Sequence, residues 1–255
     1  FATMTRTTRP DPARPLLFHA LALGASVLLA MLIYIQPGAP LAPGLDSSWA
    51  YALNYVFQHD LVLGRDIFFT FGPLGFLEHT RALTPGMLAT SSWFWFACPV
   101  VTAFLLLQLA HTTAPSRWHL LANLVLAVGL VIMLNTNIQR LLLIVYVGVF
   151  LHWRNNSLLL LLLMALTSVL ALLIKFSNGA VALSLYLPYL AALALRDRQW
   201  QQPLIGLLAL PVLCVLVWLL VYGHLAGLAG YIHGGLEFSR GSTSAMALNP
   251  DNHWP

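Results

Sequence analysis

Side chains that can do chemistry are scarce in this chain of 255 residues, and half of its acids lie in one stretch. The eight Asp and Glu residues include four between positions 46 and 78, namely Asp46, Asp60, Asp66 and Glu78. Carboxylates take up protons or bind cations. Because this stretch is the only long polar interruption before the C-terminus, we expect the function to be located there.

Two basic residues lie at the ends of apolar runs. Arg140 closes the turn Asn135–Arg140, and Lys175 follows Ile174 directly. A cation at the edge of a membrane span is a candidate functional residue. The alternative is that both side chains simply extend toward anionic lipid headgroups.

The composition indicates an all-α, polytopic membrane protein. Hydrophobic residues make up 59% of the chain and charged residues 8%, and a spanning helix needs about 20 mostly apolar residues. Leu and Ala dominate these runs without the alternation typical of barrel strands. Seven spans are expected at residues 16–35, 91–110, 119–134, 141–153, 157–174, 180–195 and 203–222.

The basic residues predict the orientation, because cytoplasmic loops retain Lys and Arg. A cytoplasmic N-terminal segment, residues 1–15, would be followed by a transmembrane module at 16–222, with an external loop at 36–90. Residues 223–255 would begin a second external loop, and we expect the chain to be a fragment of a longer protein. The net charge of +4 then mainly reflects the basic residues that set the orientation of the chain in the membrane. No basic cluster or stripe indicates binding to nucleic acid.

The external loop is expected to contain a helix along the membrane surface. Asp46 or Ser47 can cap it, and Trp49, Leu53, Val56 and Phe57 form one apolar stripe, whereas Tyr51, Asn54 and Gln58 face elsewhere. Such a helix would place its aromatic side chains at headgroup level. Asp46 would then lie where the chain leaves the bilayer, either as a reactive acid or merely as a helix cap.

The third and fourth apolar runs are short. At 1.5 Å per residue they cover roughly 24 and 20 Å of an approximately 30 Å hydrocarbon core. The turn Asn135–Arg140 between them is therefore expected to lie below the outer surface. Irregular backbone is tolerated at that depth only where it lines a protein-enclosed or watery cavity.

The plan of the chain resembles the GT-C superfamily of multi-spanning glycosyltransferases that use polyprenyl-phosphate-linked sugars. The shared features are a cytoplasmic N-terminus, a first span, an external loop with an acid directly after that span, a surface helix and further spans with short connections. Asp46 occupies the position of the first-loop acid. The string Gly64–Gly75, GRDIFFTFGPLG, is similar to a loop motif of uncharacterised bacterial members.

This resemblance implies transfer of a sugar, with inversion, from a polyprenyl-phosphate donor to an envelope glycan, lipid or protein at the periplasmic face of a bacterial inner membrane. Asp46 would take the proton of the acceptor hydroxyl, and Arg140 and Lys175 would stabilise the departing lipid phosphate. Arg65 is a weaker candidate for the second role. Asp66 would orient the acceptor or join Asp46 around a divalent cation, which some members of the superfamily need and others do not.

Two other classes of function stay open. A transporter or permease would place polar groups at the middle of several spans and show internal repeats, whereas here the informative polar groups gather at the outer boundary. A non-catalytic subunit of an envelope-assembly complex would expose an apolar or aromatic patch on the outer loop. Cys98 and Cys214 lie inside apolar runs, which argues against a disulfide or a metal site.

Overall fold

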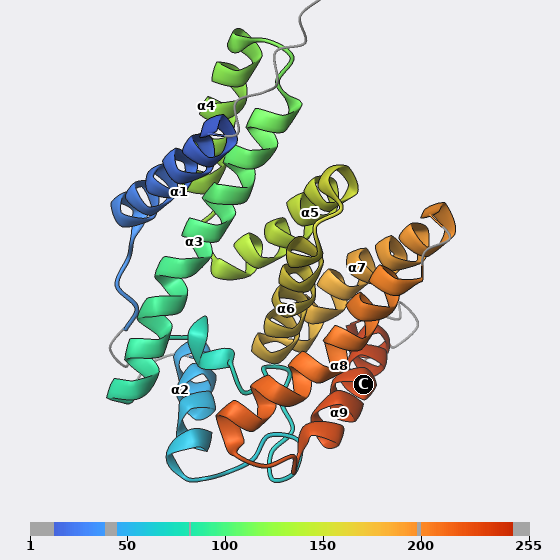
Figure 1. Cartoon of the computed structure of the whole chain (residues 1–255). Helices are drawn as coiled ribbons and strands as arrows, with labels where there is room; N and C mark the ends of the chain where they lie inside the picture. Colours follow the sequence, from blue (N-terminus) through green and yellow to red (C-terminus); the bar gives the residue numbers. More distant parts are fainter. Residues whose placement is uncertain (1–12, 39–44, 82, 198–199, 247–255) are drawn as a thin grey trace, which may run out of the picture.

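Helices account for the regular secondary structure in the computed structural model, which describes residues 13–38, 45–81, 83–197 and 200–246 (Figure 1). They are α1 Ala13–Ile33, α2 Leu45–Gln58, the 3-10 turn η1 Gly75–Leu77, α3 Pro85–Thr113, α4 Arg117–Met133, α5 Asn137–Asn155, α6 Leu158–Ile174, α7 Phe176–Asp197, α8 Gln201–Tyr222 and α9 Leu228–Met246. Only two isolated β-bridges occur in these ranges, Leu63 with Ile67 and Phe71 with Lys175. The all-helical prediction is therefore confirmed for the described residues.

Four of the helices are long and apolar enough to cross a bilayer. They contain the spans Leu16–Ile33, Pro85–Thr113, Phe176–Arg196 and Gln201–Tyr222. Helices α4 and α6 are apolar but have only 17 residues each. Large aliphatic side chains on the four long helices face outward, for example Leu32 of α1 at 84% and Leu220 of α8 at 85% exposure. Such surfaces are compatible with a multi-pass membrane protein, whose outer side chains contact lipid.

Two helices organise the packing. Helix α3 contacts α1, α4 and α5, and helix α6 contacts α5, α7 and α8, as Figure 1 shows. One cluster of buried side chains lies between α3, α4 and α5, and the other surrounds α6. The segment 59–81 packs at one end of the α6 group, which we call the loop end of the bundle.

Helix boundaries follow local capping chemistry. Thr84, Ser116 and Thr136 precede α3, α4 and α5, and each side-chain oxygen accepts a backbone N–H of the first turn. Pro85 follows Thr84 in the first helical position, where a missing N–H costs nothing. Helix α8 ends at Gly223 with φ +72°, a left-handed conformation that glycine adopts without strain.

Helix α2 forms in the region where a surface helix was predicted. Its residues Leu53 and Val56 are buried and line a cavity together with Leu61 and Leu63 of the following loop, so this part of the apolar stripe packs within the protein. Asn54, which was expected to face elsewhere, is fully buried and donates to the backbone oxygen of Arg81. A buried amide needs such a partner. The side chains of Trp49 and Phe57 lie outside the described part.

The segment 70–75 enters the bundle and pairs with the end of α6. Gly72 N–H donates to Ile174 O at 3.0 Å and Leu74 N–H donates to Leu173 O at 2.9 Å. The N–H of Phe176 donates in turn to Thr70 O. The last carbonyls of a helix have no partner inside that helix, so this segment satisfies those of α6.

Helix α9 lies in the region that was predicted to open a second external loop. Its Tyr231 is buried, and the hydroxyl donates to Leu172 O at 2.7 Å, again at the end of α6. Backbone contact between α9 and the loop is close, because a Cβ at Gly230 would lie 1.9 Å from Gly64 O. Helix α9 is therefore part of the packed loop end.

The contact of segment 70–75 with α6 yields a stability prediction. A Cβ at Gly72 would lie 2.2 Å from Leu173 O and 2.6 Å from the Tyr231 hydroxyl. Gly72→Ala should therefore lower the free energy of unfolding by about 2–3 kcal/mol, measured by SDS titration of the protein in detergent. Gly86→Ala is the control, because nothing lies within 4 Å of its Cβ. Equal stability of the two variants would contradict the described contact.

Candidate functional site

The chain directly after segment 70–75 carries an acid into the protein interior. Residues 71–77 are all buried. They are held against α3 by two hydrogen bonds, from the Ser91 hydroxyl to Phe76 O and from Trp95 Nε1 to Leu77 O at 2.7 Å. Glu78 is the next residue, and both its charge and that of Arg140 act on the thiol of Cys98. Glu78 and Arg140 thus lie near each other beside α3.

Glu78 meets the first turn of α5. It accepts a hydrogen bond from the backbone N–H of Asn137, the first residue of that helix. An acid at this position interacts favourably with the helix dipole. Burial nevertheless raises the pKa of Glu78 to about 7, against the opposing effects of the Arg140 charge and the Asn137 hydrogen bond. Glu78 therefore gains or loses its proton near neutral pH.

Arg140 is 6% exposed and lies in the first turn of α5, because the predicted turn Asn135–Arg140 is helical from Asn137 onward. One terminal nitrogen donates to Asn137 Oδ1 at 2.8 Å and the other to Leu134 O at 2.6 Å. Leu134 is the C-cap of α4, so the guanidinium lies at the negative end of that helix. The turn is consequently built around a buried cation.

Three polar atoms in this place have no hydrogen-bond partner among the described residues. They are Glu78 Oε2, Asn137 Nδ2 and Arg140 Nε, and we call these residues the Glu78–Asn137–Arg140 cluster. Unpaired buried polar atoms cost about 1–3 kcal/mol each. One acceptor and two donors of this kind suit a bound water or an anionic group.

The cluster lies beside the middle of α3. Residue 98 is 13 positions after the first and 15 before the last residue of this 29-residue helix, which at 1.5 Å per residue places it roughly 20 Å from either end. Figure 1 likewise shows α5 beginning partway along α3. The polar turn is thus inserted alongside a span, within protein contacts.

Lys175 lies at the junction of α6 and α7, beside the segment 70–75. Its Nζ atom is 4.8 Å from the centre of the Phe71 ring, and the two residues form a β-bridge. The His79 ring also packs against Phe71, in a T-shaped arrangement with the two ring centres 4.6 Å apart. The Lys175 side chain is half-buried. Lys175 is therefore held at the loop end by a cation–π contact.

Arg65 and Asp66 pair with each other in an exposed turn. Arg65 donates to both carboxylate oxygens of Asp66, at 2.9 and 2.7 Å, and Val62 N–H donates to the same carboxylate. These hydrogen bonds, first that from Arg65, lower the pKa of Asp66 to about 2. The structure thus gives both side chains a local role in shaping the 62–67 turn.

Asp46 is the second residue of α2, and its side chain lies outside the described part. Among the described residues, no three His, Cys, Asp or Glu side chains group in a way that would hold a metal ion.

Sequence reasoning identified Arg140 but missed its neighbours. Glu78 was seen as one of the clustered acids and Asn137 as part of a polar turn, without a functional role for either. The available signal was the position of Glu78 directly after the apolar run Leu74–Leu77, since a carboxylate that follows a buried segment is carried inward with it.

No family model, curated protein or solved structure matches this chain. The class is therefore defined by the structure alone, as a helical protein with four described helices that are long and apolar enough to cross a membrane and a polar cluster buried beside one of them.

The raised pKa of Glu78 predicts a pH dependence of stability. A carboxyl whose folded pKa is about 7 rather than 4.5 stabilises the fold below pH 4.5, and this contribution is lost as the pH rises through 7. At about 1.4 kcal/mol per pKa unit the loss is about 3 kcal/mol. The free energy of unfolding should fall from pH 4.5 to 8, and Glu78→Gln should remove this fall.

Asp66→Asn is the control for this experiment. The pKa of Asp66 is lowered from 3.8 to about 2, so its contribution is constant above pH 4.5 and is lost only at lower pH. The variant should therefore keep the pH profile of the original protein. Parallel profiles for the original protein and Glu78→Gln would contradict the assignment.

Proposed function

We propose that this protein is a membrane glycosyltransferase that transfers a sugar from a polyprenyl-phosphate donor to an envelope acceptor. It crosses a bacterial inner membrane seven times, with its N-terminus in the cytoplasm and the loop end of the bundle on the periplasmic side. The observation that carries the proposal is the Glu78–Asn137–Arg140 cluster, in which buried donors are left without partners.

The cluster has the features of a phosphate site. It combines two unpaired donors, Asn137 Nδ2 and Arg140 Nε, with the positive charge of the guanidinium, and both features attract phosphate oxygens. A cation beside a membrane span typically marks a substrate path. The pKa of Glu78 near 7 allows the protonated acid to donate to a phosphate oxygen, where an ionised acid would repel it.

An apolar groove begins at the same turn. It has a volume of about 480 Å³, and its lining includes Leu134, Gln139, Leu142, Tyr146 and Leu185. Leu134 also accepts the hydrogen bond from Arg140. A lipid whose phosphate binds the cluster would find an apolar path for its isoprenoid chain beside α5 and α7.

The reaction needs a base and a stabilised leaving group. The acceptor oxygen attacks the anomeric carbon from the face opposite the lipid phosphate, and Asp46 takes the hydroxyl proton. The bond between the anomeric carbon and the phosphate oxygen breaks, and the electron pair leaves with the phosphate. Arg140 and Lys175 stabilise its negative charge. A divalent cation held by Asp46 and Asp66, and a weaker phosphate contact from Arg65, belong to the same proposal.

Binding of the lipid phosphate can be measured without knowledge of the sugar. Undecaprenyl phosphate should stabilise the protein against heat in nanodiscs, and undecaprenol, which lacks the phosphate, should not. Arg140→Gln and Lys175→Gln should each weaken binding about tenfold or more, because each removes a charge-assisted contact.

Arg154→Gln is the matched control, since Arg154 is exposed in the last turn of α5, at the opposite end of that helix from Arg140. If Arg140→Gln is too unstable to purify, Lys175→Gln alone decides the test. Equal stabilisation by the lipid and the alcohol would refute a phosphate site.

The acceptor base is tested by transfer activity. With radiolabelled polyprenyl-phosphate sugars and envelope extracts, Asp46→Asn should lower the rate by about 100-fold or more, which is the usual contribution of a general base. Asp60→Asn should retain activity, because Asp60 is exposed and its φ of +55° is one that asparagine tolerates. Similar rates for the two variants would eliminate Asp46 as the base.

A further inference from the structure

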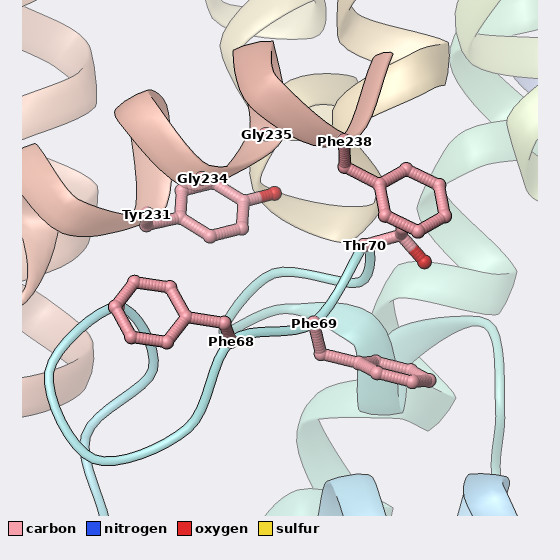
Figure 2. Close-up of a pocket in the computed structure, with 8 residues that line it drawn as sticks. Phe68, Phe69, Thr70, Tyr231, Gly234, Gly235 and Phe238 are labelled. Carbon is pink, nitrogen blue, oxygen red and sulfur yellow. The ribbon is translucent and has the colours of Figure 1, made fainter. Parts of the chain in front are cut away.

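A further cavity lies between the 64–70 loop and helix α9. Its volume is about 170 Å³, and it is lined by Gly64, Phe68, Phe69, Thr70, Tyr231, Gly234, Gly235 and Phe238. Figure 2 shows the loop residues on one side and the helix residues on the other. The same loop and the same helix together hold the end of α6.

Three phenylalanine side chains line this cavity and are also exposed at the protein surface. Phe68, Phe69 and Phe238 are 65%, 39% and 57% exposed. In Figure 2 the Phe68 ring lies on the left below Tyr231, the Phe238 ring on the upper right, and the Phe69 ring on the lower right, directed away from α9. Exposed aromatic side chains gathered at one pocket indicate a ligand with an apolar face.

Glycines leave the helix side of the cavity bare. A Cβ at Gly235 would lie 2.3 Å from the Phe176 ring, and a Cβ at Gly234 would lie 3.0 Å from Phe68 Cδ1. The first glycine lets α9 approach Phe176. The second leaves room for the Phe68 ring beside the cavity, and a larger side chain there would push the ring or fill the space.

Two hydroxyl groups supply polar contacts. The Thr70 hydroxyl has no hydrogen-bond partner among the described residues. The Tyr231 hydroxyl donates its proton to Leu172 O and keeps a lone pair that can accept a hydrogen bond. The pocket thus combines aromatic faces with one donor–acceptor group and one acceptor.

We propose that this pocket binds one pyranose ring of the carbohydrate acceptor. The C–H face of a sugar ring packs on aromatic faces, and its hydroxyls would pair with Thr70 and Tyr231. The cavity of about 170 Å³ is smaller than the roughly 300–1,000 Å³ of pockets that hold drug-sized ligands. It therefore takes a single ring with its substituents, and it is too small for a long isoprenoid chain.

The position of the pocket fits an acceptor. Phe69 also lines the small cavity shared with Ala52, Leu53 and Val56 of α2, the helix that carries Asp46 in its first turn. The pocket is thus linked through one aromatic side chain to the helix that carries the proposed base. This inference rests on the proposed function, which it deepens by naming the acceptor as a carbohydrate.

Saturation-transfer NMR tests the inference. The protein is placed in lipid nanodiscs, because alkyl maltoside detergents carry sugars of their own. Methyl glycosides of glucose, galactose, mannose and N-acetylglucosamine are the probes. At least one should show signal on its ring C–H protons, and Phe238→Ala and Gly234→Leu should reduce this signal at least fivefold.

Phe150→Ala is the control, because Phe150 is similarly exposed, at 51%, but lies on α5 outside the pocket. The saturation-transfer signal of the glycoside with this variant should equal the signal with the original protein. Absence of signal with all four glycosides, or an unchanged signal in Phe238→Ala, would overturn the inference. Glycoside binding that depends on Phe238, together with equal transfer by Asp46→Asn and Asp60→Asn, would instead refute the transferase mechanism and leave the pocket standing.

Discussion

The loop end of this protein depends on three backbone carbonyls at the C-terminus of α6. In an apolar environment an unpaired carbonyl costs several kcal/mol, and the last carbonyls of a helix have no partner within it. Here Leu172 O, Leu173 O and Ile174 O accept from Tyr231, Leu74 and Gly72. One short loop segment and one side chain of α9 thus allow α6 to end inside the bundle.

The position of the polar cluster follows from this pairing. Once the 70–75 segment is bound to α6, residues 76–78 run along α3 and bring Glu78 to the N-terminus of α5. Arg140 is held from the other direction, by its own turn and by the C-cap of α4. The stabilisation of one helix end therefore brings an acid and a cation together, and their remaining unpaired atoms provide the proposed phosphate contacts.

The apolar runs located the helices α1 and α3 to α8, because such patterns act over short distances, whereas the caps at Thr84, Ser116 and Thr136 that begin three of them were not predicted. Arg140 and Lys175 could be identified as candidates from their place at the ends of these runs. The contact of Glu78 with Asn137, the burial of Asn54 and the packing of α9 could not be predicted, since each depends on how the loop folds against helices distant in sequence.

The central claim is that the Glu78–Asn137–Arg140 cluster binds the phosphate of a polyprenyl lipid. A high-resolution cryo-electron microscopy structure of the protein in nanodiscs with undecaprenyl phosphate tests it most directly. The account predicts phosphate density within hydrogen-bonding distance of Arg140 Nε and Asn137 Nδ2, with the isoprenoid chain in the groove beside α5 and α7. A water molecule at the cluster and a phosphate that stays at the membrane surface would contradict it.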